Sequence, residues 1–280
     1  MSASRERGNA GPAVHAAPPL PATIEARFGA WIAAAADRES LRFPEIRKGV
    51  QALSARYVEG RKAGGVGAGA LGGAGLRAAF ASFYAPLHFL TAFAAANALP
   101  ASFRAGLARV VDLGAGTGAV GAALALAAGG AEVLALDRSA WALGEARHTF
   151  AAFAVRGRTR RSELPAGVPR LSASDLVAAG WLLNEGGASF RARLGGVLAR
   201  ALEAGARVLV LEPVARGVSP WWDDFAAALA PAGTASALMK WEIERPEWIA
   251  RLDEAAGLDH REIGARVLWG PAPHDERTSE

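Results

Sequence analysis

Three glycines at every second position, Gly114, Gly116 and Gly118, are the residues whose type and spacing could bind a small ligand against the backbone. They follow the apolar strand end at residues 110–113, and a helix is expected to begin at Ala119. Glycine permits a positive φ, so a ligand can lie almost in contact with the main chain at such a turn. We therefore predict a turn that binds a nucleotide or a nucleoside.

Two acids near this turn, Asp112 and Asp137, help to identify its ligand. The spacing of Gly116, Gly118 and Gly121 matches the dinucleotide fingerprint G-x-G-x-x-G, with Asp137 near the place of a ribose-binding acid. However, Asp112 precedes the first glycine by two residues, and its carboxylate would repel a pyrophosphate at the helix N-terminus. A ligand with an ammonium group would be favoured instead. A nicotinamide or flavin dinucleotide, or merely solvated acids at strand ends, remain the alternatives.

The chain after residue 107 alternates short apolar strands with amphipathic helices, which would place this turn at the edge of a sheet. We expect strands at residues 108–113, 131–137, 157–164, 174–183 and 206–213, and two more near 237–243 and 265–270. We expect helices at residues 119–129, 139–153, 189–205 and 220–233, the second with Ser139 as its N-cap. This order predicts the α/β class, with a doubly wound, mostly parallel, seven-stranded Rossmann-like sheet. Ligands bind such sheets beyond the carboxyl ends of the strands.

The composition divides the chain into four parts. We expect a disordered lead at 1–22, an α-helical N-terminal region at 23–100, the ligand-binding domain at 101–270 and a tail at 271–280. Within the helical region, residues 64–75 are so rich in glycine that they should form a loop.

Residues 80–99 are apolar over about the length of a membrane span. They contain Pro86, His88 and Asn97, and much of their apolar content is alanine, which favours two short buried helices around the proline. The first residues also have no apolar core of signal-peptide length. We therefore expect a soluble, cytoplasmic protein with no membrane partner.

Cysteine is absent from the sequence, which excludes disulfides, iron–sulfur clusters held by cysteine and a cysteine nucleophile. The five histidines are scattered without metal-ligand spacing, so no metal site is expected. The net charge of +4 comes mostly from arginine and permits contact with an anionic partner such as RNA. The densest basic patch comprises Arg156, Arg158, Arg160 and Arg161.

With Asp112 before G-x-G-x-G and Asp137 at the end of the next strand, the chain resembles the class I S-adenosylmethionine-dependent methyltransferases. The resemblance implies that the glycine turn faces the methionine part of S-adenosylmethionine. It further implies that Asp112 helps to hold the amino group and that Asp137 accepts both ribose hydroxyls. The cofactor-binding residues would be Asp112, Gly114, Ala115, Gly116, Gly118, Asp137, Arg138 and Trp181.

Three further pieces resemble the methyltransferase-like proteins associated with the small ribosomal subunit: residues 53–60, residues 80–89, and residues 175–185 followed by the strand at 209–213. That resemblance implies an acceptor in RNA or in a small-subunit component, and hence a role at the ribosome in translation. Many of those relatives carry cysteines that bind an iron–sulfur cluster, and this chain has none.

Residues that could act on a methyl acceptor lie near the ends of the fourth and fifth expected strands. Asn184 and Glu185 are the candidate catalytic residues, with capping of the next helix as their alternative role, and Glu212 ends the fifth strand. Tyr84 and His88 lie in the helical region that would cover the site.

The sequence therefore predicts an S-adenosylmethionine-dependent methyltransferase, a transferase that acts on RNA or on a component of the small ribosomal subunit. Two alternatives stay open. One is a catalytically inactive ribosome-assembly factor that retains the fold, and the other is a small-molecule methyltransferase.

Overall fold

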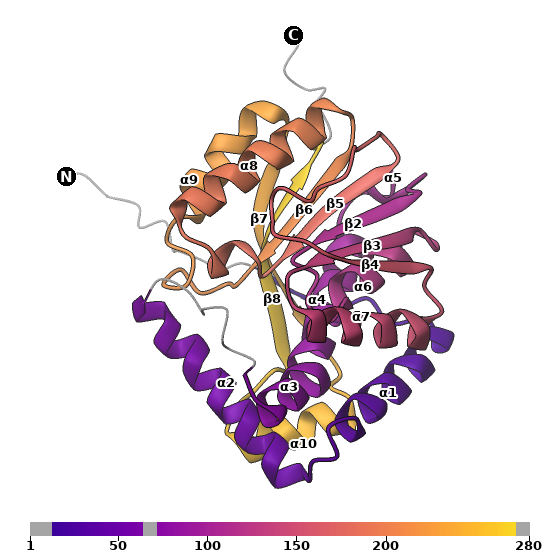
Figure 1. The fold of residues 1–280 in the computed structure, drawn as a ribbon, viewed down its shortest axis with the longest axis vertical. Helices are drawn as coiled ribbons and strands as arrows, with labels where there is room; N and C mark the ends of the chain where they lie inside the picture. The colour runs from indigo at the N-terminus through magenta and orange to yellow at the C-terminus, as the bar shows by residue number, and fades with distance from the viewer. Residues whose placement is uncertain (1–12, 64–71, 273–280) are drawn as a thin grey trace, which may run out of the picture.

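The computed structural model describes residues 13–63 and 72–272, and within them one eight-stranded sheet forms the centre of the protein (Figure 1). Its order is β1-β7-β8-β6-β5-β2-β3-β4, and only β8 runs antiparallel to its neighbours. The strands are β1 (Val14–Ala16), β2 (Arg109–Leu113), β3 (Glu132–Asp137), β4 (Gly157–Arg161), β5 (Asp175–Gly180), β6 (Arg207–Glu212), β7 (Ala235–Glu242) and β8 (Glu262–Gly270). The predicted mostly parallel, doubly wound α/β fold is confirmed, with one strand more than expected.

The additional strand, β1, comes from the segment that was expected to be disordered. Val14 pairs with Lys240 of β7, and the N–H of Ala17 donates to the Glu242 carbonyl at 2.9 Å. An edge strand such as β7 presents unpaired backbone groups, and a short extended segment satisfies them whatever its side chains are. The prediction of a disordered lead was therefore wrong for residues 14–16, while residues 1–12 lie outside the described chain.

Helices cover both faces of the sheet. They are α1 (Ala22–Asp37), α2 (Phe43–Ala63), α3 (Ala74–Ala79), α4 (Ala85–Ala98), α5 (Ala101–Arg104), α6 (Ala119–Ala127), α7 (Ala140–Phe153), α8 (Ala188–Glu203), α9 (Trp222–Leu229) and α10 (Glu247–Ala256). Short helical turns are the π-helical η1 (Phe80–Tyr84) and the 3-10 turns η2 (Leu183–Glu185) and η3 (Ala230–Ala232).

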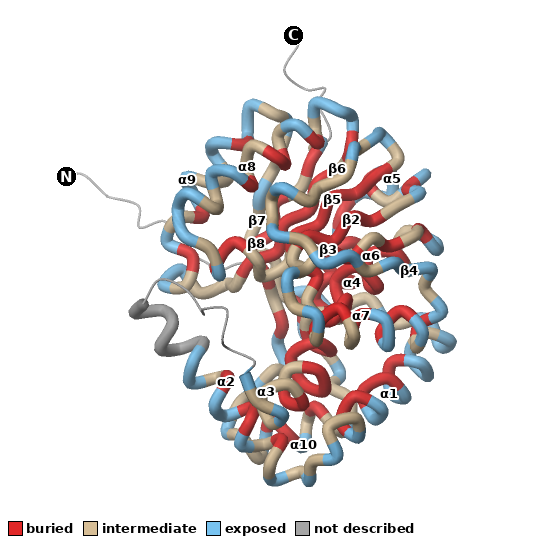
Figure 2. The backbone as a smooth tube through the Cα atoms, viewed as in Figure 1, coloured by how far each residue is buried: buried red, intermediate tan, exposed pale blue. Residues whose placement is uncertain are grey.

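Successive residues of each central strand pack into two different cores. On β2, Val110 packs with α4, α6 and α7, whereas Val111 packs on the opposite face with α8 and α9. The central strands are buried on both faces, as Figure 2 shows. Parallel strands covered on both sides read as continuous apolar runs, which is why the sequence revealed them.

The N-terminal helices belong to the same core as the sheet. Phe28 and Trp31 of α1 pack against Phe89 of α4 and Phe153 of α7, with ring centroids between 5.1 and 6.4 Å apart. Helices α1, α2, α3 and α10 gather at one end of the molecule, at the bottom of Figure 1. The boundary predicted at residue 100 is thus a change of secondary structure and not of packing.

One continuous helical stretch, Ala74–Ala98, replaces the two short helices expected around Pro86. The proline sits at the second residue of α4, directly after the π-helical turn η1, and so at a helix start, where it is tolerated. The stretch is long and apolar enough to cross a membrane, but 83% of its apolar window is buried inside the protein. This burial agrees with the prediction of core helices rather than a membrane span.

Candidate functional site

The glycine turn joins β2 to α6 and adopts the backbone conformation predicted from the sequence. The φ angles of Gly114, Gly116 and Gly118 are +64°, +52° and +74°. At Gly114 a Cβ would lie 2.4 Å from a methyl carbon of Leu182, whereas at Gly116 it would meet nothing within 4 Å. The backbone is therefore held tightly on one side and open on the other, as a ligand cradle requires.

A cavity of about 650 Å³ opens beyond the carboxyl ends of the strands, beside this turn. Its wall combines the turn, the ends of β3 and β5, the helical stretch η1–α4 and the beginning of β8. The predicted residues that line it are Asp112, Gly114, Ala115, Gly116, Asp137, Arg138, Trp181, Asn184 and Glu185. Gly118 does not line it, because its Cα faces α7, where a Cβ would meet Ala146 and Phe150.

Asp112 lies at the floor of the cavity, 1% exposed. Its Oδ2 accepts a hydrogen bond from the N–H of Gly121 at 2.9 Å, in the first turn of α6. Burial raises the pKa of Asp112 to about 7, although the Gly121 hydrogen bond lowers it. A cationic group beside Asp112 would restore its charge, whereas a pyrophosphate at the same helix end would meet this carboxylate. The arrangement disfavours the dinucleotide alternative.

Asp137 is the last residue of β3, and its carboxylate links the glycine turn to the start of α7 through hydrogen bonds. Its Oδ2 accepts from the N–H of Gly116 at 2.9 Å, and its Oδ1 accepts from the N–H of Ser139 at 2.7 Å. A carboxylate oxygen accepts more than one hydrogen bond, so both oxygens can still receive hydroxyl groups from the cavity. Ser139 in turn caps α7 through the N–H of Ala142 at 3.2 Å, as predicted.

Trp181 lines the cavity and also packs against the hydrophobic core from its edge. It has a φ of +54°, which is rare for a residue with a large side chain, and its N–H donates to the Leu211 carbonyl at 2.7 Å. Its ring stacks on His88 with centroids 3.8 Å apart and planes 8° apart. Burial, with a smaller contribution from His260, lowers the pKa of His88 to about 3, so this imidazole is neutral.

Asn184 and Glu185 lie in η2, directly after β5. The side chain of Asn184 is buried, and its Oδ1 has no hydrogen-bond partner within the described residues. Glu185 is exposed at the rim of the cavity. Neither side chain caps α8, whose N-cap is Gly187. The alternative role as helix caps was therefore wrong, and the open Oδ1 of Asn184 remains available to a ligand N–H or O–H.

Glu212 is fully buried at the end of β6 and is absent from the cavity wall. Its Oε1 accepts from the N–H of Leu183 at 2.7 Å. Burial raises the pKa of Glu212 to about 8, although hydrogen bonds from the backbone N–H groups of Leu183 and Asn184 lower it. Its role is to hold the η2 loop in place rather than to contact a ligand.

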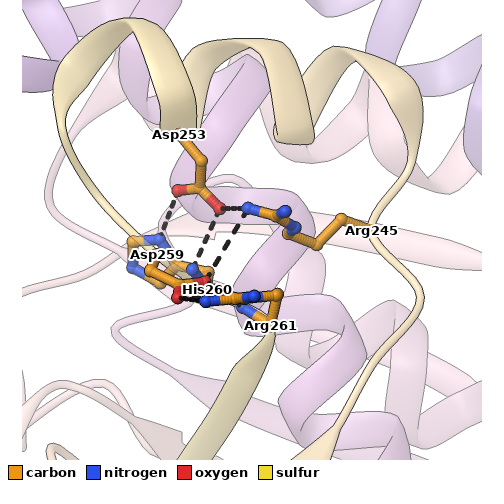
Figure 3. Close-up of polar contacts among 5 residues, drawn as sticks. All are labelled: Arg245, Asp253, Asp259, His260 and Arg261. Atoms are coloured by element: carbon orange, nitrogen blue, oxygen red, sulfur yellow. Dashed lines mark hydrogen bonds and ion pairs between the residues drawn. The ribbon is translucent and has the colours of Figure 1, made fainter.

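One cluster of polar side chains beside the cavity was not foreseen from the sequence. Figure 3 shows Asp253 of α10 with Arg245 and His260 around it, and His260 also lines the cavity. The sequence contains a signal for this cluster. Ile249, Leu252 and Asp253 share the buried face of an amphipathic helix, where an isolated acid is unusual. Among the described residues, no group of three or more His, Cys, Asp or Glu side chains could hold a metal ion.

A family model described as the methyltransferase small domain matches residues 94–177 of the chain. The match runs from the end of α4 through the glycine turn and β3 to β5, which is less than half of the sequence. No curated protein matches the chain. The family model and the fold support a class I S-adenosylmethionine-dependent methyltransferase.

Solved structures of methyltransferases resemble the chain at low identity. The S-adenosylmethionine-dependent methyltransferase SibL is 20% identical over 78% of this chain and 69% of its own, with a TM-score of 0.47. A precorrin-6y C5,15-methyltransferase from Geobacter metallireducens is 17% identical over 60% of this chain and 81% of its own, with a TM-score of 0.43. The magnesium protoporphyrin IX methyltransferase of Synechocystis, solved with bound S-adenosylmethionine, is 19% identical over 65% and 78%, with a TM-score of 0.43.

The residues of the cavity fit S-adenosylmethionine as the cofactor. The backbone at Gly116 leaves the space that a ligand against the turn needs. Asp112 offers a buried carboxylate for an ammonium group, and Asp137 offers two oxygens for a pair of hydroxyls. A cofactor with one amino acid end and one ribose matches this donor set.

Proposed function

We propose that the protein is a methyltransferase that uses S-adenosylmethionine. The observation that carries the proposal is the position of two carboxylates, Asp112 and Asp137, on either side of an open glycine turn at the edge of one cavity. In this proposal Asp112 provides the ammonium site and Asp137 provides the diol site. The family-model match over residues 94–177 supports the same conclusion.

In this proposal the protein mainly positions and encloses the reactants. S-adenosylmethionine, when bound, supplies an electrophilic methyl group on a sulfonium. Asp112 and Asp137 hold the two ends of the cofactor, and the Trp181–His88 stack forms the wall beside them. Methyl transfer depends on in-line placement of the acceptor, which a preformed cavity provides by removing translational and rotational freedom.

We further propose that the acceptor belongs to RNA or to a component of the small ribosomal subunit, and that the protein works in the cytoplasm. Exposed arginines on and beside β4, at the edge of the sheet nearest Asp137, support an RNA partner: Arg156, Arg158, Arg160 and Arg161. Two of them also hold the local backbone, since Arg160 donates to the Gly167 carbonyl and Arg161 to the Arg138 carbonyl. Arg158 is therefore the best choice for testing contact with phosphates.

The test of the RNA acceptor uses tritiated S-adenosylmethionine and RNA from bacterial small ribosomal subunits. We expect transfer of label to RNA, and we expect Arg158→Ser to weaken RNA binding and to lower its salt slope by about 0.7, the value for one phosphate contact on a single strand. Arg193→Ser is the matched control, because Arg193 is an exposed arginine that lies on α8 and not on the edge strand β4. Equal RNA affinity of the wild type, Arg158→Ser and Arg193→Ser would show that the arginine patch does not contact RNA.

A small-molecule acceptor is the second candidate, favoured by the helical stretch that lies over the cavity. Phe80, Tyr84, Leu87 and His88 all line it from this side, which leaves an apolar, partly covered space. Transfer of label to small phenols but not to RNA would favour this candidate. RNA binding with cofactor binding but without transfer to either acceptor would favour an inactive assembly factor.

A further inference from the structure

We propose that His260, held by Asp253, accepts the proton of a methyl acceptor that reaches the cavity as an O–H or N–H. The inference rests on the proposed methyl transfer and adds the class of acceptor, a group that must lose a proton. It places a second functional centre at the α10–β8 connection, where His260 lines the cavity.

The contacts of Asp253 orient His260. Asp253 is completely buried, and its Oδ1 lies 2.6 Å from the Nδ1 of His260. Its Oδ2 accepts from Arg245 at 2.8 Å and from the N–H of His260 at 2.9 Å, as Figure 3 shows. The imidazole is therefore fixed by both its ring and its backbone. A buried carboxylate without such partners would be costly.

The protonation of the pair follows from these contacts. Although burial raises the pKa of Asp253, the hydrogen bonds from His260 and Arg245 outweigh it and hold the pKa below its ordinary value. Asp253 is thus an anion that can only accept hydrogen bonds, so Nδ1 of His260 must carry the hydrogen. In the neutral imidazole, Nε2 then keeps its lone pair.

Other groups around His260 are compatible with this role. His88 of α4, neutral at ordinary pH, lies near enough to be coupled to it, and Phe83 of η1 meets the His260 ring edge to face at 5.3 Å. The remaining titratable and charged groups from the elements around it are Tyr84, Arg245, Asp253, Asp259, Arg261 and Glu262. Asp259 is paired with Arg261 and lies 3.8 Å from Arg245, so its charge is already balanced.

The proposed step balances. As the acceptor oxygen or nitrogen bonds to the methyl carbon, the sulfur–methyl bond breaks and its electron pair stays on sulfur. The acceptor proton passes to Nε2 of His260, and the imidazolium later releases it to water. The products are the methylated acceptor, S-adenosylhomocysteine and one proton. General-base assistance of this kind typically contributes about 10²- to 10⁴-fold to a rate.

The first experiment needs no acceptor. In protein with ¹⁵N-labelled histidine, NMR should show His260 as the tautomer with hydrogen on Nδ1, assigned by comparison with His260→Gln. Asp253→Asn should change that tautomer balance. Hydrogen on Nε2 in the wild-type protein would overturn the proposal, whether or not methyl transfer is ever observed.

The second experiment measures single-turnover transfer of label from S-adenosylmethionine to small-subunit RNA across a range of pH. His260→Gln should lower the rate at least 100-fold and remove its rise with pH, while the Kd for S-adenosylmethionine changes less than about twofold. His148→Gln, at an exposed position of α7, is the matched control. Unchanged rates and pH profile in His260→Gln would refute the role of His260, whereas absence of transfer by the wild type would count against the proposed acceptor.

Discussion

Asp137 offers the sharpest single test of the cofactor site. Its two carboxylate oxygens already bind the N–H groups of Gly116 and Ser139, at 2.9 and 2.7 Å, and face the cavity. Substitution by alanine, Asp137→Ala, removes the proposed acceptor of both ribose hydroxyls. It also releases the two backbone groups that fix the glycine turn against α7.

The size of the effect follows from the two hydrogen bonds that would be lost. Hydrogen bonds to a charged group contribute about 1.5–3 kcal/mol each, so two of them amount to about 3–6 kcal/mol. Because every 1.4 kcal/mol changes an affinity about tenfold, the Kd for S-adenosylmethionine should rise by about 10²- to 10⁴-fold. The backbone groups released lie beside the open cavity, where water can replace the carboxylate, so the fold should survive.

Isothermal titration calorimetry measures this change, with circular dichroism and thermal melting as the checks of folding. Glu132→Ala is the matched control, since Glu132 begins the same strand at its opposite end and forms only an exposed ion pair with Arg156. The control should bind S-adenosylmethionine like the wild type. A folded Asp137→Ala protein with a Kd within about threefold of wild type would refute the assignment of the ribose site.

Three further predictions follow from other parts of the site. Gly116→Ala should cost about 1–2 kcal/mol of stability through its φ of +52° and should also block the cofactor, which thermal melting and calorimetry would report together. Thr149→Val should lower the free energy of unfolding in urea by about 1–3 kcal/mol, because the Thr149 hydroxyl accepts from Trp31 at 3.2 Å and donates to the Thr117 carbonyl at 2.8 Å. Equal stability of the variant and the wild type would show that these two hydrogen bonds do not stabilise the fold. Because the pKa of Glu212 is raised from 4.5 to about 8, its folded carboxyl stays protonated where the unfolded one ionises. The free energy of unfolding should therefore fall as pH rises from about 4.5 to 8, by at most ~1.4 kcal/mol per pH unit, and Glu212→Gln should flatten that slope.

The sequence predicted the glycine turn and the two acids beside it because these features depend on local patterns. A glycine turn needs its own residue types, and the acid at Asp137 follows a recognisable strand. Strand pairing then brings these pieces to one edge without further information, since parallel strands align their carboxyl ends. For this reason the turn, Asp112 and Asp137 all fall on the wall of one cavity.

The contact between Asp253 and His260 could not be predicted in the same way. Asp253 and His260 are seven residues apart, and their contact depends on how the helix end at Gly257, with a φ of +72°, turns the chain back. The place of His260 at the cavity depends in turn on packing between α10 and the N-terminal helices, such as the contact of Trp248 with Phe43 of α2. The strand at Val14–Ala16 was missed for a related reason, because its pairing is set by the free edge of β7 and not by its own pattern.

The central claim is tested most directly by titrating the purified protein with S-adenosylmethionine, S-adenosylhomocysteine and NADH under identical conditions. We expect S-adenosylmethionine and S-adenosylhomocysteine to bind at one site and NADH not to bind. Binding of NADH in preference to S-adenosylmethionine, or saturation by none of the three, would contradict it.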